Sequence, residues 1–215
     1  NTGLKTILLL TGKENPEEMK RWQKAATDFI GGHKVDDIAI MAQEVYDEYV
    51  SPALWQGTID IAQTHLSNGE EVWLVTAAPQ DMAHLISERL GFTGALGSRA
   101  EIKDGLYTGA MSGNLLHGKE KAIAIAELAV KRQFDLADCY AYSDRHNDLP
   151  LLLAVGHPSA INPDAVLRIR ALREKWPIHD FRRARVINRI CGPLFSRIAS
   201  VAVLMLPRRN REKDR

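Results

Sequence analysis

Apolar residues recur every three or four positions through the first third of the chain, which is the spacing of one face of a helix. In the segment 15–31 the apolar residues that follow this spacing are Met19, Trp22, Ala26 and Ile30. Asn15 and Pro16 are typical of a helix start, as N-cap and first helical residue. The same spacing predicts two more helices, over 34–50 and 55–69.

The pattern changes after residue 70, where a short apolar run of strand-forming residues spans 71–76. A second such run spans 139–143. The remaining segments predict a helix near 80–90, a hairpin over 98–111 that turns at Asp104 and Gly105, and helices over 118–134 and 148–156. Strands that alternate with helices imply an α/β fold with a mostly parallel sheet.

The composition indicates a globular chain with room for one large core. Of its 215 residues, 45% are hydrophobic and 26% are charged, which suits one core and a smaller appended unit. The two cysteines, Cys139 and Cys191, form neither a disulfide framework nor a metal-binding spacing. This use of cysteine suits a reducing compartment, and we expect a cytoplasmic protein.

Positive charge is concentrated at the end of the chain. Residues 181–215 contain ten Arg and Lys against Glu212 and Asp214, a net charge of +8, which leaves −7 for the rest of a chain whose total is +1. The apolar stretch in this segment is interrupted by Arg197 and is shorter than the roughly 20 residues of a membrane-spanning helix. Basic residues beside an apolar stretch predict weak contact with an anionic membrane surface. A helix packed on the core with a solvated basic end has the same pattern, and nucleic acid is not an expected partner because few aromatic residues lie among the basic ones.

Polar residues follow both predicted strands. In open parallel sheets, ligand sites lie beyond the carboxyl ends of the strands, where Thr76 and Asp144 stand. A hydroxyl at a helix start and the ammonium of Lys121 suit a phosphate, and the carboxylates of Asp144 and Asp148 suit Mg²⁺. Taken singly, these residues have simpler structural roles, as a helix cap, a solvated lysine and a pair of acids in a first turn. Their order and spacing together favour a site for a phosphate and a divalent cation.

Four segments resemble the haloacid dehalogenase (HAD) superfamily in its phosphoserine-phosphatase-like branch. They are "VWLVTAAP", Lys121 within "HGKEKAIAI", "AYSDRHNDLPLL" and "AINPD", which are similar, in that order, to the second, third and fourth motifs of the family. "DGLYTG" also looks like this branch. The resemblance covers about residues 15–182 and implies a Rossmann-like parallel sheet with helices on both faces, plus a helical cap. Residues 1–54 would be the remaining part of the cap, 55–180 the hydrolase core, and 181–215 a basic, partly apolar tail.

The resemblance implies that four residues hold the substrate, a small phosphorylated metabolite. Thr76 would hydrogen-bond the transferred phosphoryl group, with the backbone of Ala77 beside it. Lys121 would neutralise the charge of that group. Asn147 stands where the branch tends to have Asn, and we expect it to contact the substrate.

The resemblance also implies a magnesium site in the fourth motif. Asp144 would bind Mg²⁺ as the metal ligand of this motif. Asp148 would support the metal or orient the lysine, and so belongs with the catalytic residues. Ser143 stands where many members have Gly, a departure that a small side chain should allow.

The first motif of the family is not matched by any segment of this chain. Members open with an apolar strand that ends in Asp-x-Asp, where the first acid is the nucleophile and the second is the general acid and base. The segment 5–14 is apolar but passes into Thr11 and Gly12, and Asp36 with Asp37 lies in a helical pattern. Because the cap follows that motif and the chain begins with Asn, we expect a fragment that is inactive by itself. The parent would act through a phosphoaspartyl intermediate on phosphoserine or another small phosphomonoester.

Two other interpretations stay open from the sequence. A catalytically inactive domain would keep the fold for binding or regulation, and would lack Asp-x-Asp upstream. A receiver domain of the response-regulator kind also uses Asp, Thr and Lys around magnesium. The helices before the first strand and the hairpin are not typical of a receiver.

Overall fold

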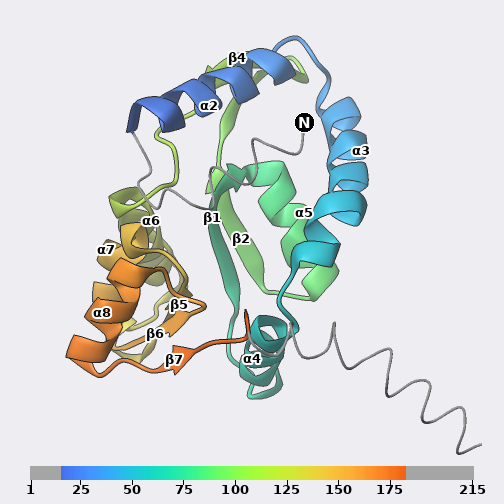
Figure 1. Cartoon of the computed structure of the whole chain (residues 1–215). Coiled ribbons are helices and arrows are strands. Elements are labelled where there is room, and N and C mark those ends of the chain that lie inside the picture. Colours follow the sequence, from blue (N-terminus) through green and yellow to red (C-terminus); the bar gives the residue numbers. More distant parts are fainter. Residues whose placement is uncertain (1–15, 183–215) are drawn as a thin grey trace, which may run out of the picture. The chain divides into compact units, whose positions relative to one another are not determined.

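Parallel strands form two sheets in the computed structural model, which describes residues 16–182 (Figure 1). In one sheet β1 (Trp73–Pro79) pairs with β2 (Gly94–Ser98), beginning with Trp73 opposite Gly94. In the other, the order is β5 (Tyr140–Ser143), β6 (His157–Ile161) and β7 (Ile178–His179). The predicted α/β class with parallel strands is confirmed, whereas β2, β6 and β7 were not predicted from the sequence.

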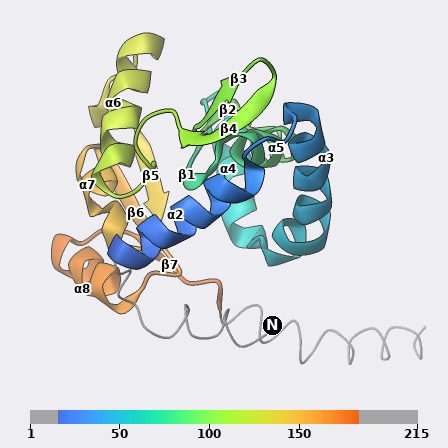
Figure 2. The same ribbon diagram turned by 90° about the horizontal axis from the view of Figure 1, so that it is seen from above.

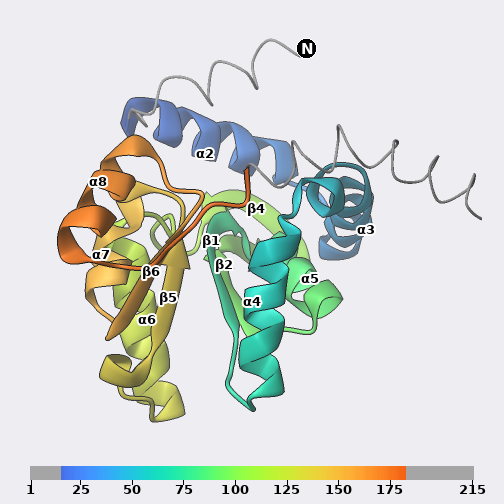
Figure 3. The same ribbon diagram turned by 60° about the horizontal axis from the view of Figure 1, so that its bottom comes forward.

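Helices connect these strands and cover both faces of β5. Helices α5 (Gln80–Leu90), α7 (Leu149–Leu153) and α8 (Ala165–Glu174) each link one strand to its neighbour, and α6 (Lys119–Arg132) precedes β5. On one face of β5, Ala141 packs into the core with residues of α6, α7 and α8. On the other face, Tyr142 shares a 2.8 Å hydrogen bond with His65 of α4 (Gln56–Ser67). The alternation of side chains along a strand therefore places helices on both sides of this sheet (Figure 3).

The core lies between β5, β6 and the helices α6 to α8. Leu152 and Leu167 are completely buried there, as are Ala160 and Ala171. Burial of a leucine side chain contributes about 1.5–3 kcal/mol, so α7 and α8 hold the loops at the ends of β5 and β6 in place.

The N-terminal helices agree with the predicted pattern except in one stretch. Helices α2 (Pro16–Ile30) and α4 confirm the predictions over 15–31 and 55–69. The helix predicted over 34–50 is confirmed as α3 (Val35–Val45), but its last five residues form a π-helical turn, η1 (Tyr46–Val50), which passes into a 3₁₀ turn, η2 (Ser51–Ala53). Pro52 in η2 cannot continue an α-helix, since it has no N–H.

The predicted hairpin is confirmed as β3 (Ala100–Lys103) and β4 (Leu106–Met111), which pair antiparallel. Asp104 and Gly105 at its turn have φ angles of 51° and 77°, the left-handed values that a two-residue hairpin turn requires. Helix α2 lies across β4 (Figures 1 and 2). Tyr107 of β4 is 2% exposed and donates a 2.6 Å hydrogen bond to Asp81 of α5. Burial, and after it the Asp81 carboxylate, raises the pKa of Tyr107.

Three short elements complete the described part: η3 (Leu136–Asp138), η4 (His146–Asp148) and a bridge between Lys34 and Leu106. Residues up to His179 form one unit, and the chain from Asp180 belongs to a second unit, of which residues 180–182 are described. Most of the predicted basic tail, 183–215, therefore lies outside the described residues, and the predicted boundary near residue 54 stays a prediction. None of the helices found between residues 16 and 182 is long and apolar enough to span a membrane.

Candidate active site

Thr76 lies inside β1 rather than at its end, because this strand continues to Pro79. Regular pairing with β2 is interrupted between Val75 and Pro79, so Thr76 occupies an irregular stretch of the strand. Its hydroxyl oxygen accepts a 3.2 Å hydrogen bond from the backbone N–H of Ala78. This bond orients the hydroxyl and leaves its hydrogen for an acceptor such as a phosphoryl oxygen.

Ser98, at the end of β2, connects this stretch to the segment that leads into α6. Its buried hydroxyl donates a 2.8 Å hydrogen bond to the carbonyl of Ala77 and accepts a 3.0 Å bond from the backbone N–H of Leu116. The Ser98 side chain thus connects the end of β1 to the segment that precedes α6. Sequence reasoning missed Ser98, because it stands in no motif and its partners are distant along the chain.

Gly118 is the N-cap of helix α6, and its φ is 55°, a positive value that favours glycine. A Cβ at this position would lie 3.5 Å from the carbonyl oxygen of Asn147, so the start of the helix approaches the backbone of η4 closely. The approach brings Lys121 to Asp148, with 2.8 Å between Nζ and Oδ2. Only 12% of the lysine side chain and 10% of the aspartate side chain are exposed, so this is a buried ion pair.

Ser143 holds the other side of Asp148. Its buried hydroxyl donates a 2.8 Å hydrogen bond to Oδ2 of Asp148, the oxygen that also binds Lys121. The same hydroxyl accepts a 3.2 Å bond from the backbone N–H of Arg145. Ser143 is therefore a hydrogen-bonding member of the cluster, and not only the small residue that the family resemblance predicted at this position.

Asp144 lies at the end of β5 with 61% of its side chain exposed, and Arg145 is 3.9 Å away. Desolvation by the surrounding chain raises the pKa of this carboxyl; Arg145 opposes the increase, Asp148 adds to it and Lys121 reduces it. Asp144 is therefore electrostatically coupled to the Lys121–Asp148 pair while it stays open to solvent. An accessible carboxylate in that position can bind a cation.

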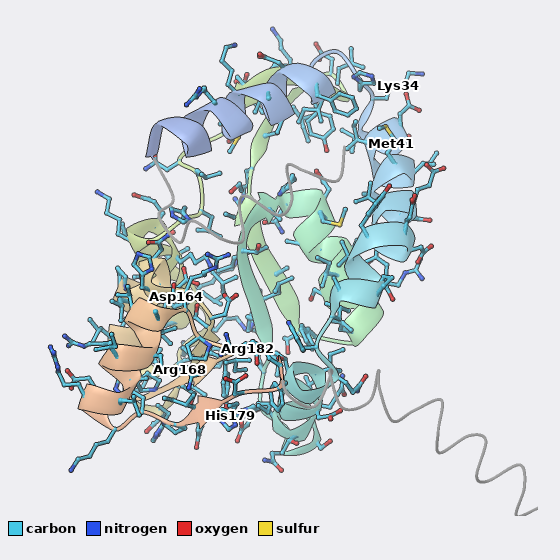
Figure 4. All side chains as sticks on the ribbon, viewed as in Figure 1. Lys34, Met41, Asp164, Arg168, His179 and Arg182 are labelled. Carbon is cyan, nitrogen blue, oxygen red and sulfur yellow. The ribbon has the colours of Figure 1, made fainter. Side chains whose placement is uncertain are left out.

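Asp164, which is labelled in Figure 4, fixes the loop that carries Asp144. Its backbone N–H donates a 2.9 Å hydrogen bond to the carbonyl of Asp144. Its side chain caps α8 by accepting from the N–H of Leu167 at 2.8 Å, and it also accepts from the N–H and ring of His146 at 3.0 and 2.9 Å. Burial alone would raise the pKa of Asp164, but these hydrogen bonds outweigh it and lower the pKa.

The structure brings some of the predicted residues together. Lys121, Asp148 and Asp144 form one cluster, and Asn147 lies half-buried in η4 beside them. Thr76 and Ala77 belong to the other sheet, and in residues 16–182 no hydrogen bond or ion pair joins them to Lys121 or Asp144. In the same residues, no three His, Cys, Asp or Glu side chains form a group that could hold a metal ion.

Known proteins are similar to this chain in sequence and in fold. Residues 7–153 match the haloacid dehalogenase-like hydrolase family. The chain is 44% identical over 204 residues to a hydrolase of Mycobacterium leprae, covering 94% of this chain and 68% of the relative. It is 45% identical over 184 residues to phosphoserine phosphatase SerB1 of Mycobacterium tuberculosis, covering 86% of this chain and 60% of that protein. The crystal structure of a protein of unknown function from Bordetella pertussis Tohama I superposes with a TM-score of 0.69 at 28% identity, covering 74% of this chain and 72% of that one.

The chain therefore belongs to the haloacid dehalogenase-like hydrolase family, and within it to the phosphoserine-phosphatase-like phosphatases. It spans less than two thirds of the length of SerB1. Activity, substrate and cofactor of the whole protein follow as proposals.

Proposed function

We propose that this chain is part of a Mg²⁺-dependent phosphatase that hydrolyses a small phosphomonoester in the cytoplasm through a phosphoaspartyl intermediate. The observation that supports it best is the buried 2.8 Å pair of Lys121 and Asp148 with the accessible carboxylate of Asp144 beside it. Burying an ion pair costs desolvation energy, so a fold has little reason to keep one for stability alone. A fixed cation next to an open carboxylate suits the binding of a phosphoryl group and a metal ion.

Each proposed substrate contact uses a group that the protein already orients. Asp148, which also accepts a hydrogen bond from Ser143, holds Lys121, whose ammonium has three donors and can neutralise a phosphoryl oxygen. The Thr76 hydroxyl and the Ala77 N–H would hydrogen-bond other phosphoryl oxygens, and Asn147 would contact the rest of the substrate. Ser98 would position Ala77 and the approach to α6 together.

The donor set fits magnesium in part. Mg²⁺ prefers oxygen ligands, keeps several waters, and is usually held by one or two carboxylates and substrate phosphate. Asp144 supplies one exposed carboxylate, whereas Asp148 is engaged by Lys121 and Ser143 and would act by orienting the lysine. When bound, the ion would withdraw charge from the phosphoryl oxygens.

We further propose that the nucleophile belongs to a strand between β1 and β5. Within residues 16–182, β1 pairs with β2 and β5 with β6, so each sheet has an edge without a strand partner in that range. Unpaired edges expose backbone donors and acceptors. A strand there would bring a carboxylate between Thr76 on one sheet and Asp144 on the other.

The proposal is tested by phosphate release from phosphoserine and a panel of other small phosphomonoesters, with Mg²⁺. We compare residues 1–215 with the parent protein that includes the upstream sequence. Residues 1–215 should show no turnover, because Thr76 and Lys121 can hold a phosphate but cannot attack it. The parent should turn over, and Asp144→Asn should abolish its activity. Activity of residues 1–215 that Asp144→Asn removes would show that the nucleophile lies elsewhere. A folded parent inactive on every substrate would favour the alternative of an inactive binding or regulatory domain.

The segment 181–215 is proposed to contact anionic membrane surfaces weakly. The proposal rests on its net charge of +8 and its apolar stretch. Residues 183–215 lie outside the described part of the chain, so it is a proposal from sequence.

A further inference from the structure

Helix α8 has an apolar surface on the side that faces away from the core. Leu167 and Ala171 of this helix are completely buried. Val166, Ile169 and Leu172 are exposed by 54%, 60% and 65%. With 3.6 residues per turn, these three side chains lie together on the outward side. We call these three side chains the outer surface of α8. The solvent-exposed face of a surface helix is usually polar, so an apolar one indicates a binding partner.

Basic side chains border the outer surface of α8. Between Ala165 and Lys175 there are four cations, Arg168, Arg170, Arg173 and Lys175, and one anion, Glu174, a net charge of +3. On a helix of this pitch, Arg168 and Arg170 lie on opposite sides of the apolar side chains, and Arg173 lies among them. Arg170 forms a 2.9 Å ion pair with Glu174, which partly neutralises its charge.

We propose that the outer surface of α8 lies on a membrane surface that contains anionic lipids, with the helix parallel to the membrane plane. Apolar side chains flanked by arginines are the pattern by which a helix enters the boundary between headgroups and acyl chains. The arginines would then contact lipid phosphates. This inference does not depend on the proposed phosphatase activity.

Charge decides against a second copy of the chain as the occupant. A twofold contact through this helix would use the same patch on both copies, so one net charge of +3 would face another. Like charges at such an interface are unfavourable, whereas an anionic lipid surface is complementary. Nucleic acid would match the charge but would leave Val166, Ile169 and Leu172 against a polar backbone.

The test is co-sedimentation of residues 1–215 with vesicles of phosphatidylcholine alone and of phosphatidylcholine with phosphatidylserine. Two variants change the outer surface differently: Ile169→Asp removes apolar contact, and Arg173→Glu reverses a charge. The matched control is Val130→Asp on α6, where the valine is 82% exposed. The unchanged chain should bind only the anionic vesicles. The affinity of each α8 variant for these vesicles should be lower by about fivefold or more, and that of the control should equal the affinity of the unchanged chain. All three positions are exposed, and urea unfolding of each variant shows that it is folded.

Three results would overturn the proposal. The first is that the chain binds no vesicle, and the second is that it binds neutral and anionic vesicles equally. The third is that both α8 variants bind as well as the control, which would assign any lipid contact to the segment 181–215. Sedimentation velocity tests whether a second copy of the chain occupies the surface. A dimer that dissociates in the Ile169→Asp variant would assign the surface to that second copy.

Discussion

The buried pair of Lys121 and Asp148 gives the sharpest test of the site's energetics. Lys121→Met keeps most of the side-chain length and removes the charge. The Asp148 carboxylate then stays about nine-tenths buried, and among residues 16–182 the Ser143 hydroxyl is its remaining side-chain donor. Loss of one partner of a buried pair costs about 3–5 kcal/mol, whereas an exposed pair contributes about 0.2–1 kcal/mol. Because both side chains are nearly buried, we expect a loss of about 3 kcal/mol in the free energy of unfolding.

Removing the second charge should restore part of this loss. Asp148→Asn leaves an acceptor for Ser143, and Asn remains suitable at the N-terminus of α7. The double variant Lys121→Met with Asp148→Asn buries no charge at this pair. Its loss in the free energy of unfolding should therefore be smaller than the sum of the two single losses by about 2 kcal/mol. The assay is urea unfolding followed by circular dichroism, and the control is Lys119→Met, an exposed lysine of the same helix. Additive single effects, or a Lys121→Met cost no larger than that of Lys119→Met, would refute the reasoning.

Three further predictions follow from the contacts of the site and the hairpin. In the parent protein, Asp144→Asn should lower kcat by about a thousandfold or more while far-UV circular dichroism is unchanged, because a cation ligand is worth several kcal/mol; retention of most activity would exclude it as an essential ligand. Asp164→Asn keeps the helix cap but loses the charge whose pKa is lowered. The stability from that charge is complete above the ordinary aspartate pKa and is lost as pH falls through the lowered one, so unfolding midpoints of the variant and the unchanged chain should converge in acid; a constant difference would contradict this. Tyr107→Phe should cost about 1–3 kcal/mol in urea unfolding, because it leaves Asp81 without its 2.6 Å donor; an unchanged midpoint would contradict it.

Local signals explain which elements the sequence predicted. Asp104 and Gly105 both tolerate positive φ, so a hairpin turn could be placed on them without knowledge of the rest of the fold. Helix α2 follows from Pro16 and the apolar spacing after it. The end of α3 could not be predicted in the same way, because the apolar spacing continues past Val45 while the backbone widens to a π-helical turn.

Short strands and distant contacts explain what the sequence did not predict. Strand β7 has two residues, and β6 contains Pro158, so neither is a typical apolar run. In the site, the order of Thr76, Lys121 and Asp144 was clear from the motifs. The bond from Ser98 to Ala77 spans 21 residues, and the pair of Lys121 with Asp148 spans 27. Such pairings depend on how the strands assemble, which no local pattern contains.

The division of the strands into two sheets has a consequence for folding. Each parallel pair joins strands that are consecutive along the chain, so its closure requires only a connection that contains one α-helix. The strand that we propose between β1 and β5 would contact both sheets and join segments far apart in sequence, so we expect its insertion to be the slow, late step of folding. The same geometry should allow complementation in trans. A synthetic peptide with the upstream strand sequence could add to the two open edges by backbone hydrogen bonds, as in donor-strand exchange.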